Sequence, residues 1–164
     1  MLNVTVQSLI EDYAFNSMLI YRYADDLSNE ESLIQPEFDH NCFNWVLGHI
    51  VQGRNDALHS LDCDPVWGEV YKAKYERGSA RLRTTADAVP ITDLLEYLKL
   101  TEEKMKEKLL TSSDEFLDQV VSTSRGDKSR IADVASLHWH ESYHLGQLDI
   151  LRMLSISKRP HGSG

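Results

Sequence analysis

The sequence has few cysteines, and their positions argue against a disulfide or a thiolate metal site. Cys42 and Cys63 are the only two among 164 residues. If both lie on one helix, they are about 30 Å apart at ~1.5 Å per residue, whereas a disulfide needs Cα atoms within roughly 7 Å. Neither cysteine belongs to a CxxC pair, the spacing typical of zinc and redox sites. The lack of a predicted disulfide agrees with a reducing compartment, and we expect a cytoplasmic protein.

Long hydrophobic runs are also missing. No apolar stretch approaches the roughly 20 residues that cross a bilayer as a helix. Residues 1–7 have no basic region ahead of an apolar stretch, so they do not have the pattern of a signal peptide. We therefore expect no membrane partner, which again favours a cytoplasmic location.

Basic residues are few in comparison with acidic ones. The chain has 17 Lys and Arg against 26 Asp and Glu, for a net charge of -9. Affinity for nucleic acid requires a basic face that neutralises phosphates, so we expect no nucleic-acid partner. We interpret the one dense basic cluster as a solvated loop, with a surface that contacts an anion or cofactor as the alternative. Its members are Lys72, Lys74, Arg77, Arg81 and Arg83.

Helical periodicity is what the sequence does have, in four segments, and no segment shows convincing strand alternation. The first helix is predicted over about residues 4–27 and the third over about 92–110. The second begins after Asp39 or Asn41, either of which is a plausible N-cap, and ends near position 61. The fourth begins after Ser129, another good N-cap, and ends near position 154.

The segment 62–90 separates the second and third predicted helices. Proline and glycine residues interrupt it and leave room for one short packed helix. A connection of this length usually runs along a bundle instead of forming a tight hairpin. We therefore predict an all-α fold, a four-helix bundle over residues 1–156 with a long crossover between helices 2 and 3. Residues 157–164 are predicted to form a disordered tail.

Three histidines stand out by their positions in the predicted helices. His140 and His144 are four residues apart, so their imidazoles project from one helix face within reach of a single ion. Both interrupt an apolar stripe, where a polar ring needs a partner to offset its burial. His49 interrupts the inward stripe of the second helix in the same way. Three histidines with an open position are typical of catalytic zinc sites. The alternative is hydrogen-bonded core or surface histidines.

Polar residues next to these histidines are candidates for supporting roles. Glu141 follows His140 and is the leading carboxylate for proton transfer or for orienting a ligand, with a solvated glutamate as the alternative. Gln147 lies three residues after His144, and Gln52 three after His49. Either glutamine is placed to hydrogen-bond a ligand imidazole or a bound water. We therefore select Glu141 and Gln147 as the candidate catalytic residues.

Two segments resemble the signature sequences of a known superfamily. Residues 43–50 (FNWVLGHI) and 140–148 (HESYHLGQL) resemble, in this order, the two signature segments of the DinB-like superfamily. That superfamily includes the YfiT-like metal-dependent thiol transferases. The resemblance covers about residues 5–155. It departs at Leu145, where many relatives have a basic residue, so a partner contact made by that residue is not expected here.

The resemblance implies a four-helix bundle in which His49, His140 and His144 hold one zinc or nickel ion. It also implies a low-molecular-weight thiol, such as bacillithiol or mycothiol, that is conjugated to a small-molecule substrate. Many relatives are homodimers, so a homodimer is expected.

Three hypotheses for function follow from these observations. The first is a metal-dependent thiol transferase in stress response or detoxification, in which the ion activates a thiol. The second is a metal-dependent hydrolase, in which the same residues activate a water. The third is a stress-linked bundle that binds metal or dimerises without turnover, with a coordinatively closed site.

Overall fold

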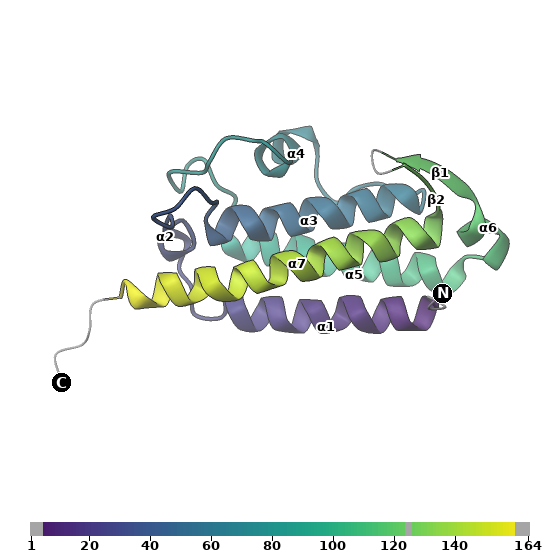
Figure 1. The fold of residues 1–164 in the computed structure, drawn as a ribbon, viewed down its shortest axis with the longest axis horizontal. Helices are drawn as coiled ribbons and strands as arrows, with labels where there is room; N and C mark the ends of the chain where they lie inside the picture. The colour runs from purple at the N-terminus through teal and green to yellow at the C-terminus, as the bar shows by residue number, and fades with distance from the viewer. Residues whose placement is uncertain (1–4, 124–125, 160–164) are drawn as a thin grey trace.

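The computed structural model describes residues 5–123 and 126–159, and the chain is mostly helical. Four long helices lie side by side along the molecule (Figure 1). α7 packs against α3 and α1, and α5 packs against the same two helices, so the four surround one interior. Their bounds are α1 Val6–Ala24, α3 Phe43–Ser60, α5 Ile91–Thr111 and α7 Arg130–Ser157.

Side-chain caps fix where two of these helices begin. The Ser129 hydroxyl accepts a hydrogen bond from the Ala132 backbone N–H, which confirms the predicted N-cap of α7. Thr5 caps α1 in a reciprocal capping box with Ser8. The predicted cap of α3 is wrong, because this helix begins later, at Phe43, with Cys42 in the N-cap position and no side-chain cap.

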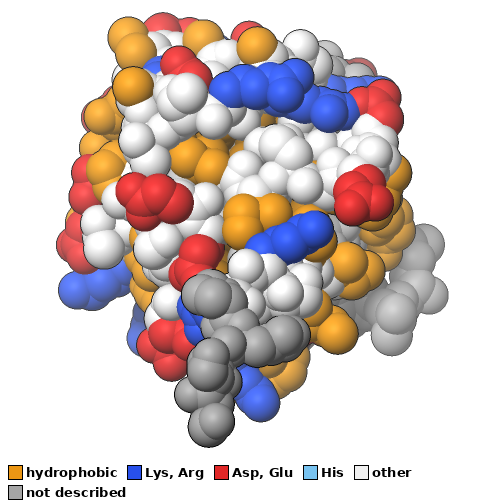
Figure 2. Space-filling view, turned by 90° about the vertical axis from the view of Figure 1, so that its left-hand side faces the viewer, with side chains coloured by type: hydrophobic (Ala, Val, Ile, Leu, Met, Phe, Trp, Pro, Cys, Tyr) orange, Lys and Arg blue, Asp and Glu red, His pale blue; other side chains and the backbone are white. Residues whose placement is uncertain are grey.

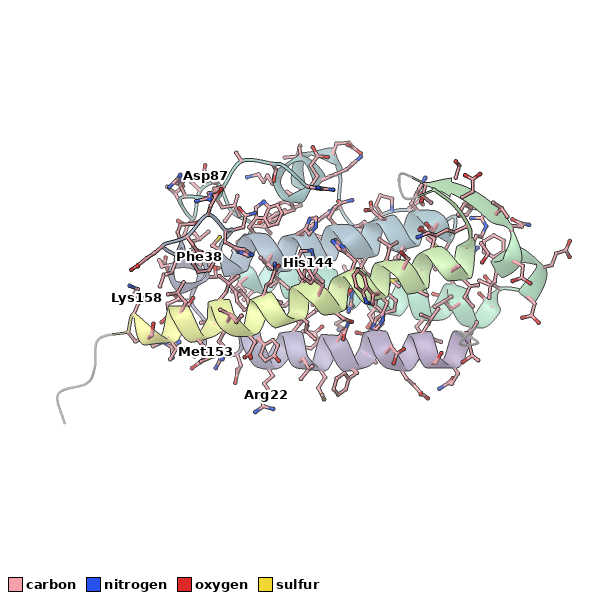
Figure 3. The ribbon with its side chains drawn as sticks, in the orientation of Figure 1. Arg22, Phe38, Asp87, His144, Met153 and Lys158 are labelled. Carbon is pink, nitrogen blue, oxygen red and sulfur yellow. The ribbon has the colours of Figure 1, made fainter. Side chains whose placement is uncertain are left out.

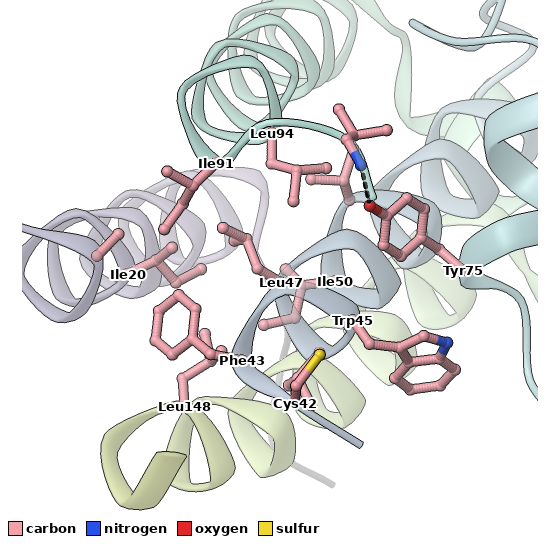
Figure 4. Packing of buried hydrophobic residues seen from close by; sticks show 14 of the residues in the cluster. Ile20, Cys42, Phe43, Trp45, Leu47, Ile50, Tyr75, Ile91, Leu94 and Leu148 are labelled. Carbon is pink, nitrogen blue, oxygen red and sulfur yellow. Dashed lines mark hydrogen bonds between the residues drawn. The ribbon is translucent and has the colours of Figure 1, made fainter. Parts of the chain in front are cut away.

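The crossover between α3 and α5 is packed against the bundle. It contains α4 (Glu69–Tyr75), which contacts α3 and lies above it in Figure 1. The Tyr75 ring is fully buried, and its hydroxyl accepts a hydrogen bond from the Val89 backbone N–H (Figure 4). The same hydroxyl donates to the Asn44 side-chain oxygen at 2.9 Å. Tyr75 therefore ties the middle of the crossover and its C-terminal end to α3.

Gly48 makes this close approach feasible. A Cβ atom at position 48 would overlap the Tyr75 ring. The ring is also stacked on Trp67, with centroids 5.6 Å apart, so it has little room to move. The crossover can lie this close to α3 only because position 48 carries no side chain.

A small hairpin precedes α7 and corrects the prediction of an entirely helical chain. β1 (Val120–Thr123) and β2 (Gly126–Ser129) pair antiparallel, with Val120 opposite Ser129. A short helix, α6 (Asp114–Asp118), leads into it, and α2 (Asn29–Ser32) is a second short helix. The strands were missed because this polar segment lacks apolar alternation, and the hairpin is held by backbone hydrogen bonds.

The predicted disordered tail overlaps residues that are ordered. Ser157 still belongs to α7, and the Arg159 guanidinium forms ion pairs with Glu31 at 2.6 Å and Asp26 at 3.0 Å. The start of the predicted tail is therefore held against the α1–α2 connection. The remaining part, 160–164, lies outside the described residues. Among the helices of the described ranges, none combines the length and the apolarity that a membrane crossing needs.

Candidate metal centre

The three predicted histidines come together where α3 faces α7. One nitrogen from each of His49, His140 and His144 lies within 4.8 Å of the others. Figure 3 labels His144, which lies on α7 at its boundary with α3. The structure thus places all three side chains in one cluster that is close enough to hold a metal ion.

The spacing of His140 and His144 fits a divalent ion. The Nε2 atoms of His140 and His144 are 3.1 Å apart. Two nitrogens at ~2.0–2.1 Å from one ion are about 2.9 Å apart at a right angle and about 3.3 Å apart in a tetrahedron, so the observed spacing lies between these limits. The His49 ring is nearly perpendicular to both others, at 82° and 85°. Imidazole donors of this kind accept zinc, nickel, copper and cobalt.

Two hydrogen bonds orient the rings with Nε2 toward the centre of the cluster. His144 Nδ1 donates to the Gln147 side-chain oxygen at 2.6 Å, and His49 Nδ1 donates to the Tyr75 backbone carbonyl at 2.7 Å. Because carbonyl oxygens only accept, each Nδ1 carries the proton and each Nε2 keeps a lone pair. Such contacts raise the basicity of a ligand and fix its tautomer. Gln147 therefore lies against the His144 imidazole, and the catalytic role expected of it stays a prediction.

Burial lowers the pKa values of two of the imidazoles, His49 and His144. His144 is only 8% exposed, and burial lowers its pKa to about 4, although the hydrogen bond to Gln147 raises it. Burial also lowers the pKa of His49, against the opposing effect of the Tyr75 carbonyl. Near pH 7 both rings are unprotonated, which is the state that binds a metal ion.

The cluster opens on a cleft of about 680 Å³ between α3, α4 and α7. His49 and His140 form part of its wall, and His140 is the most accessible of the three rings. The remaining lining mixes charged, polar and apolar groups. It comprises Gln52, Gly53, Asp56, Lys72, Glu76, Arg77, Ser136, Leu137 and Trp139.

The predicted basic cluster divides between the cleft and the outer surface. Lys72 and Arg77 line the cleft, where an anionic group can meet them. Lys74 donates to the Asp87 carbonyl, and Arg81 pairs with Asp39. Figure 2 shows Lys and Arg side chains in a row near the top of the molecule, on the side where the crossover lies in Figure 1. Two of the five residues thus line the cleft, and the contact with an anion or cofactor stays a prediction for them.

The Glu141 side chain lies in the interior, where its partner is Arg54 and not one of the three histidines. Its carboxylate is buried and accepts two hydrogen bonds from Arg54, from Nη2 at 2.7 Å and from Nε at 2.8 Å. Asn16 donates a third at 3.2 Å. Glu141 lies one residue after His140, about 100° further around the helix, and therefore faces the interior while His140 faces the cleft.

Gln52 also forms hydrogen bonds to residues other than the three histidines. Its side-chain oxygen accepts from Trp67 Nε1 at 2.9 Å, and its amide donates to Asp56 at 2.9 Å. The residue that orients His49 is instead Tyr75, through a backbone carbonyl. Arg54 was missed as well, although a signal exists: Arg54 and Glu141 are charged residues that interrupt the interior stripes of two facing helices.

Comparison with known proteins supports the fold and nothing finer. No protein-family model matches the chain, and no curated protein does. The crystal structure of a conserved protein from Enterococcus faecalis is similar, with a TM-score of 0.73 over 95% of this chain and 100% of that one. The two sequences are 17% identical. A likeness at this identity shows that the two chains share a helical fold.

Proposed function

We propose that the protein is a metal-dependent enzyme with a DinB-like four-helix bundle, and that it binds one divalent ion, zinc or nickel, on His49, His140 and His144. The observation that carries this proposal is the convergence of three imidazoles, two of which, His49 and His140, line a cleft. His49 and His144 are held neutral by burial and oriented through Nδ1. A purely structural cluster needs no such opening to solvent.

The reaction that we propose is transfer of a low-molecular-weight thiol, such as bacillithiol or mycothiol, to an electrophilic small molecule in stress response or detoxification. A divalent ion bound here would lower the pKa of a thiol or water toward neutral pH. The chain would supply the remaining elements. Trp139 and Leu137 offer apolar contact, while Lys72 and Arg77 offer charge to an anionic group of the thiol or the substrate. The resemblance of segments 43–50 and 140–148 to the DinB-like signatures supports this choice.

The test is a transferase assay with the zinc- and nickel-loaded protein. Bacillithiol, mycothiol, glutathione and coenzyme A are each offered with an electrophile such as a chlorinated nitrobenzene. We expect conjugation with at least one thiol and its loss in His144→Ala. Turnover of an ester or amide without any thiol would instead identify a hydrolase, and absence of all turnover in the metal-loaded protein would favour the non-catalytic bundle.

We also propose that the protein forms a homodimer through α7. Trp139, Tyr143, Ile150 and Met153 are all more than half exposed. Their spacings of four, seven and three residues place them on one helix face, and Gly146 lies between them where it allows a close approach. A second copy of this helix would cover the stripe.

Light scattering coupled to size-exclusion chromatography tests the dimer. We expect a dimer for the wild type and a monomer for the double variant Ile150→Lys/Met153→Lys. Val70→Lys, which alters an equally exposed apolar residue on α4, is the matched control and should remain dimeric. A monomeric wild type would contradict this proposal without affecting the metal site.

A further inference from the structure

One buried guanidinium contacts all four long helices. Arg54 is 1% exposed and projects from α3 into the interior. It forms two hydrogen bonds to Glu141 of α7 at 2.7 and 2.8 Å. The same group donates to the Tyr13 carbonyl of α1 at 3.3 Å and the Leu98 carbonyl of α5 at 3.4 Å. Arg54 thereby joins helices that lie on opposite sides of the interior.

Stability alone explains this ion pair poorly. Removing two charges from water is costly, and replacing a buried pair by apolar residues of similar volume is often neutral or stabilising. The Tyr13 ring, a member of an apolar core cluster, lies 5.2 Å from the Arg54 guanidinium carbon, so such a replacement has an apolar neighbour. A pair that adds little to stability can still select one arrangement of the helices over others.

The position of Glu141 indicates what the pair selects. At about 100° per residue, His140 lies about 100° and His144 about 60° to the same side of Glu141 on α7. Fixing the Glu141 carboxylate therefore fixes the rotation of α7 about its axis. On α3, Arg54 follows His49 by five residues, so both partners of the pair belong to the helices that carry the histidines.

We propose that the Arg54–Glu141 ion pair is a positioning device for the metal centre. It sets the rotation of α7 relative to α3 and so holds His140 and His144 at the correct distance from His49. Asn16 of α1 contributes by donating to the Glu141 carboxylate and to Ser142 at 3.2 Å each. This proposal rests on the proposed metal site and assigns to Arg54 and Glu141 an effect on metal affinity that is separate from folding.

The experiment separates metal affinity from stability. The double variant Arg54→Met/Glu141→Leu replaces the pair by apolar side chains of similar length. Stability of the metal-free protein is measured by urea denaturation, and zinc affinity by competition with a chromophoric chelator. We expect stability close to that of the wild type and zinc affinity reduced about tenfold or more, as for loss of groups that orient ligands. The cobalt(II) absorption spectrum should change at the same time.

Two further variants keep the test decisive. Arg54→Lys retains the charge but not the two-point contact, and its zinc affinity should fall severalfold even if the double variant does not fold. Ser60→Ala is the matched control, because it removes another buried hydrogen bond between α3 and α7, to Asp133 at 2.7 Å. Asp133 lies seven residues, about two helical turns, before His140. This control should lower stability and leave zinc affinity unchanged.

Each outcome decides for or against the proposal. Wild-type zinc affinity and an unchanged cobalt spectrum in either Arg54 variant would overturn the positioning role while leaving the metal site intact. A wild-type protein that binds no stoichiometric zinc would overturn both. Reduced affinity in the Arg54 variants, with the Ser60→Ala protein unaffected, supports the proposal.

Discussion

Two polar clusters lie between the same pair of helices, and they differ in almost every property. The histidine cluster opens on a cleft, and burial lowers the pKa values of two of its rings, His49 and His144. The Arg54–Glu141 cluster is an ion pair buried in the interior, and Arg54 also donates hydrogen bonds to backbone carbonyls of the two other long helices, α1 and α5. Neutral donors with an open side suit ligand binding, whereas a closed charged pair suits the fixing of geometry. One interface between two helices can thus divide these two tasks between its faces.

Breaking the closed cluster should have the largest effect on folding. Glu141→Ala leaves the Arg54 guanidinium buried without its carboxylate, and we expect a loss of about 3–5 kcal/mol in the free energy of unfolding. Urea denaturation of the metal-free protein measures this. His140→Ala, which alters the accessible member of the open cluster, should cost much less. Equal losses in the two variants would contradict the distinction between the clusters.

Acid should lower the stability of the folded protein through His144, a member of the open cluster. The folded state holds this ring neutral to about pH 4, whereas the unfolded chain protonates it below its ordinary value of 6.5. The unfolded state therefore binds more protons, and stability falls as the pH drops from 6.5 to 4, by on the order of 3 kcal/mol.

The difference in unfolding free energy between wild type and His144→Asn, measured with chelator at several pH values, isolates this effect. The unfolding free energy of the wild type should fall relative to that of the variant as the pH falls through this range. A difference that stays constant with pH would show that His144 titrates normally in the folded protein.

Disturbing the support of His49 should have an intermediate effect. Gly48→Ala introduces a Cβ that overlaps the Tyr75 ring, so the crossover must shift, at a cost of about 1–3 kcal/mol. Because the Tyr75 carbonyl accepts from His49, zinc affinity should fall as well. Gly53→Ala, where a Cβ meets no atom within 4 Å, is the matched control and should leave both stability and affinity nearly unchanged.

The smallest effect is expected from the support of His144. Gln147→Leu removes the acceptor of the Nδ1 proton and should reduce zinc affinity about tenfold with little change in stability. Gln52→Leu is the control, because that glutamine contacts Trp67 and Asp56. If both variants lost the same affinity, the cleft as a whole, and not the imidazole contact, would govern metal binding.

The sequence predicted the residues that obey local periodicity. His140 and His144 follow from a four-residue spacing on one helix, and Ser129 from the capping preference of serine. What could not be predicted depends on distant partners. Glu141 was placed at the metal because it adjoins His140, but Arg54, 87 residues away in sequence, holds its side chain in the interior. The contact between His49 and Tyr75 involves a backbone carbonyl, which leaves no trace in residue type.

The central claim is that three histidines bind one divalent ion, and metal analysis of the protein produced without a histidine tag tests it most directly. Protein loaded with zinc and freed of excess metal should retain close to one ion per chain, measured by mass spectrometry. Chelator should remove the ion and lower the melting temperature, and His144→Ala should retain none. A wild-type protein that holds no stoichiometric metal, with a melting temperature that chelator leaves unchanged, would contradict the account.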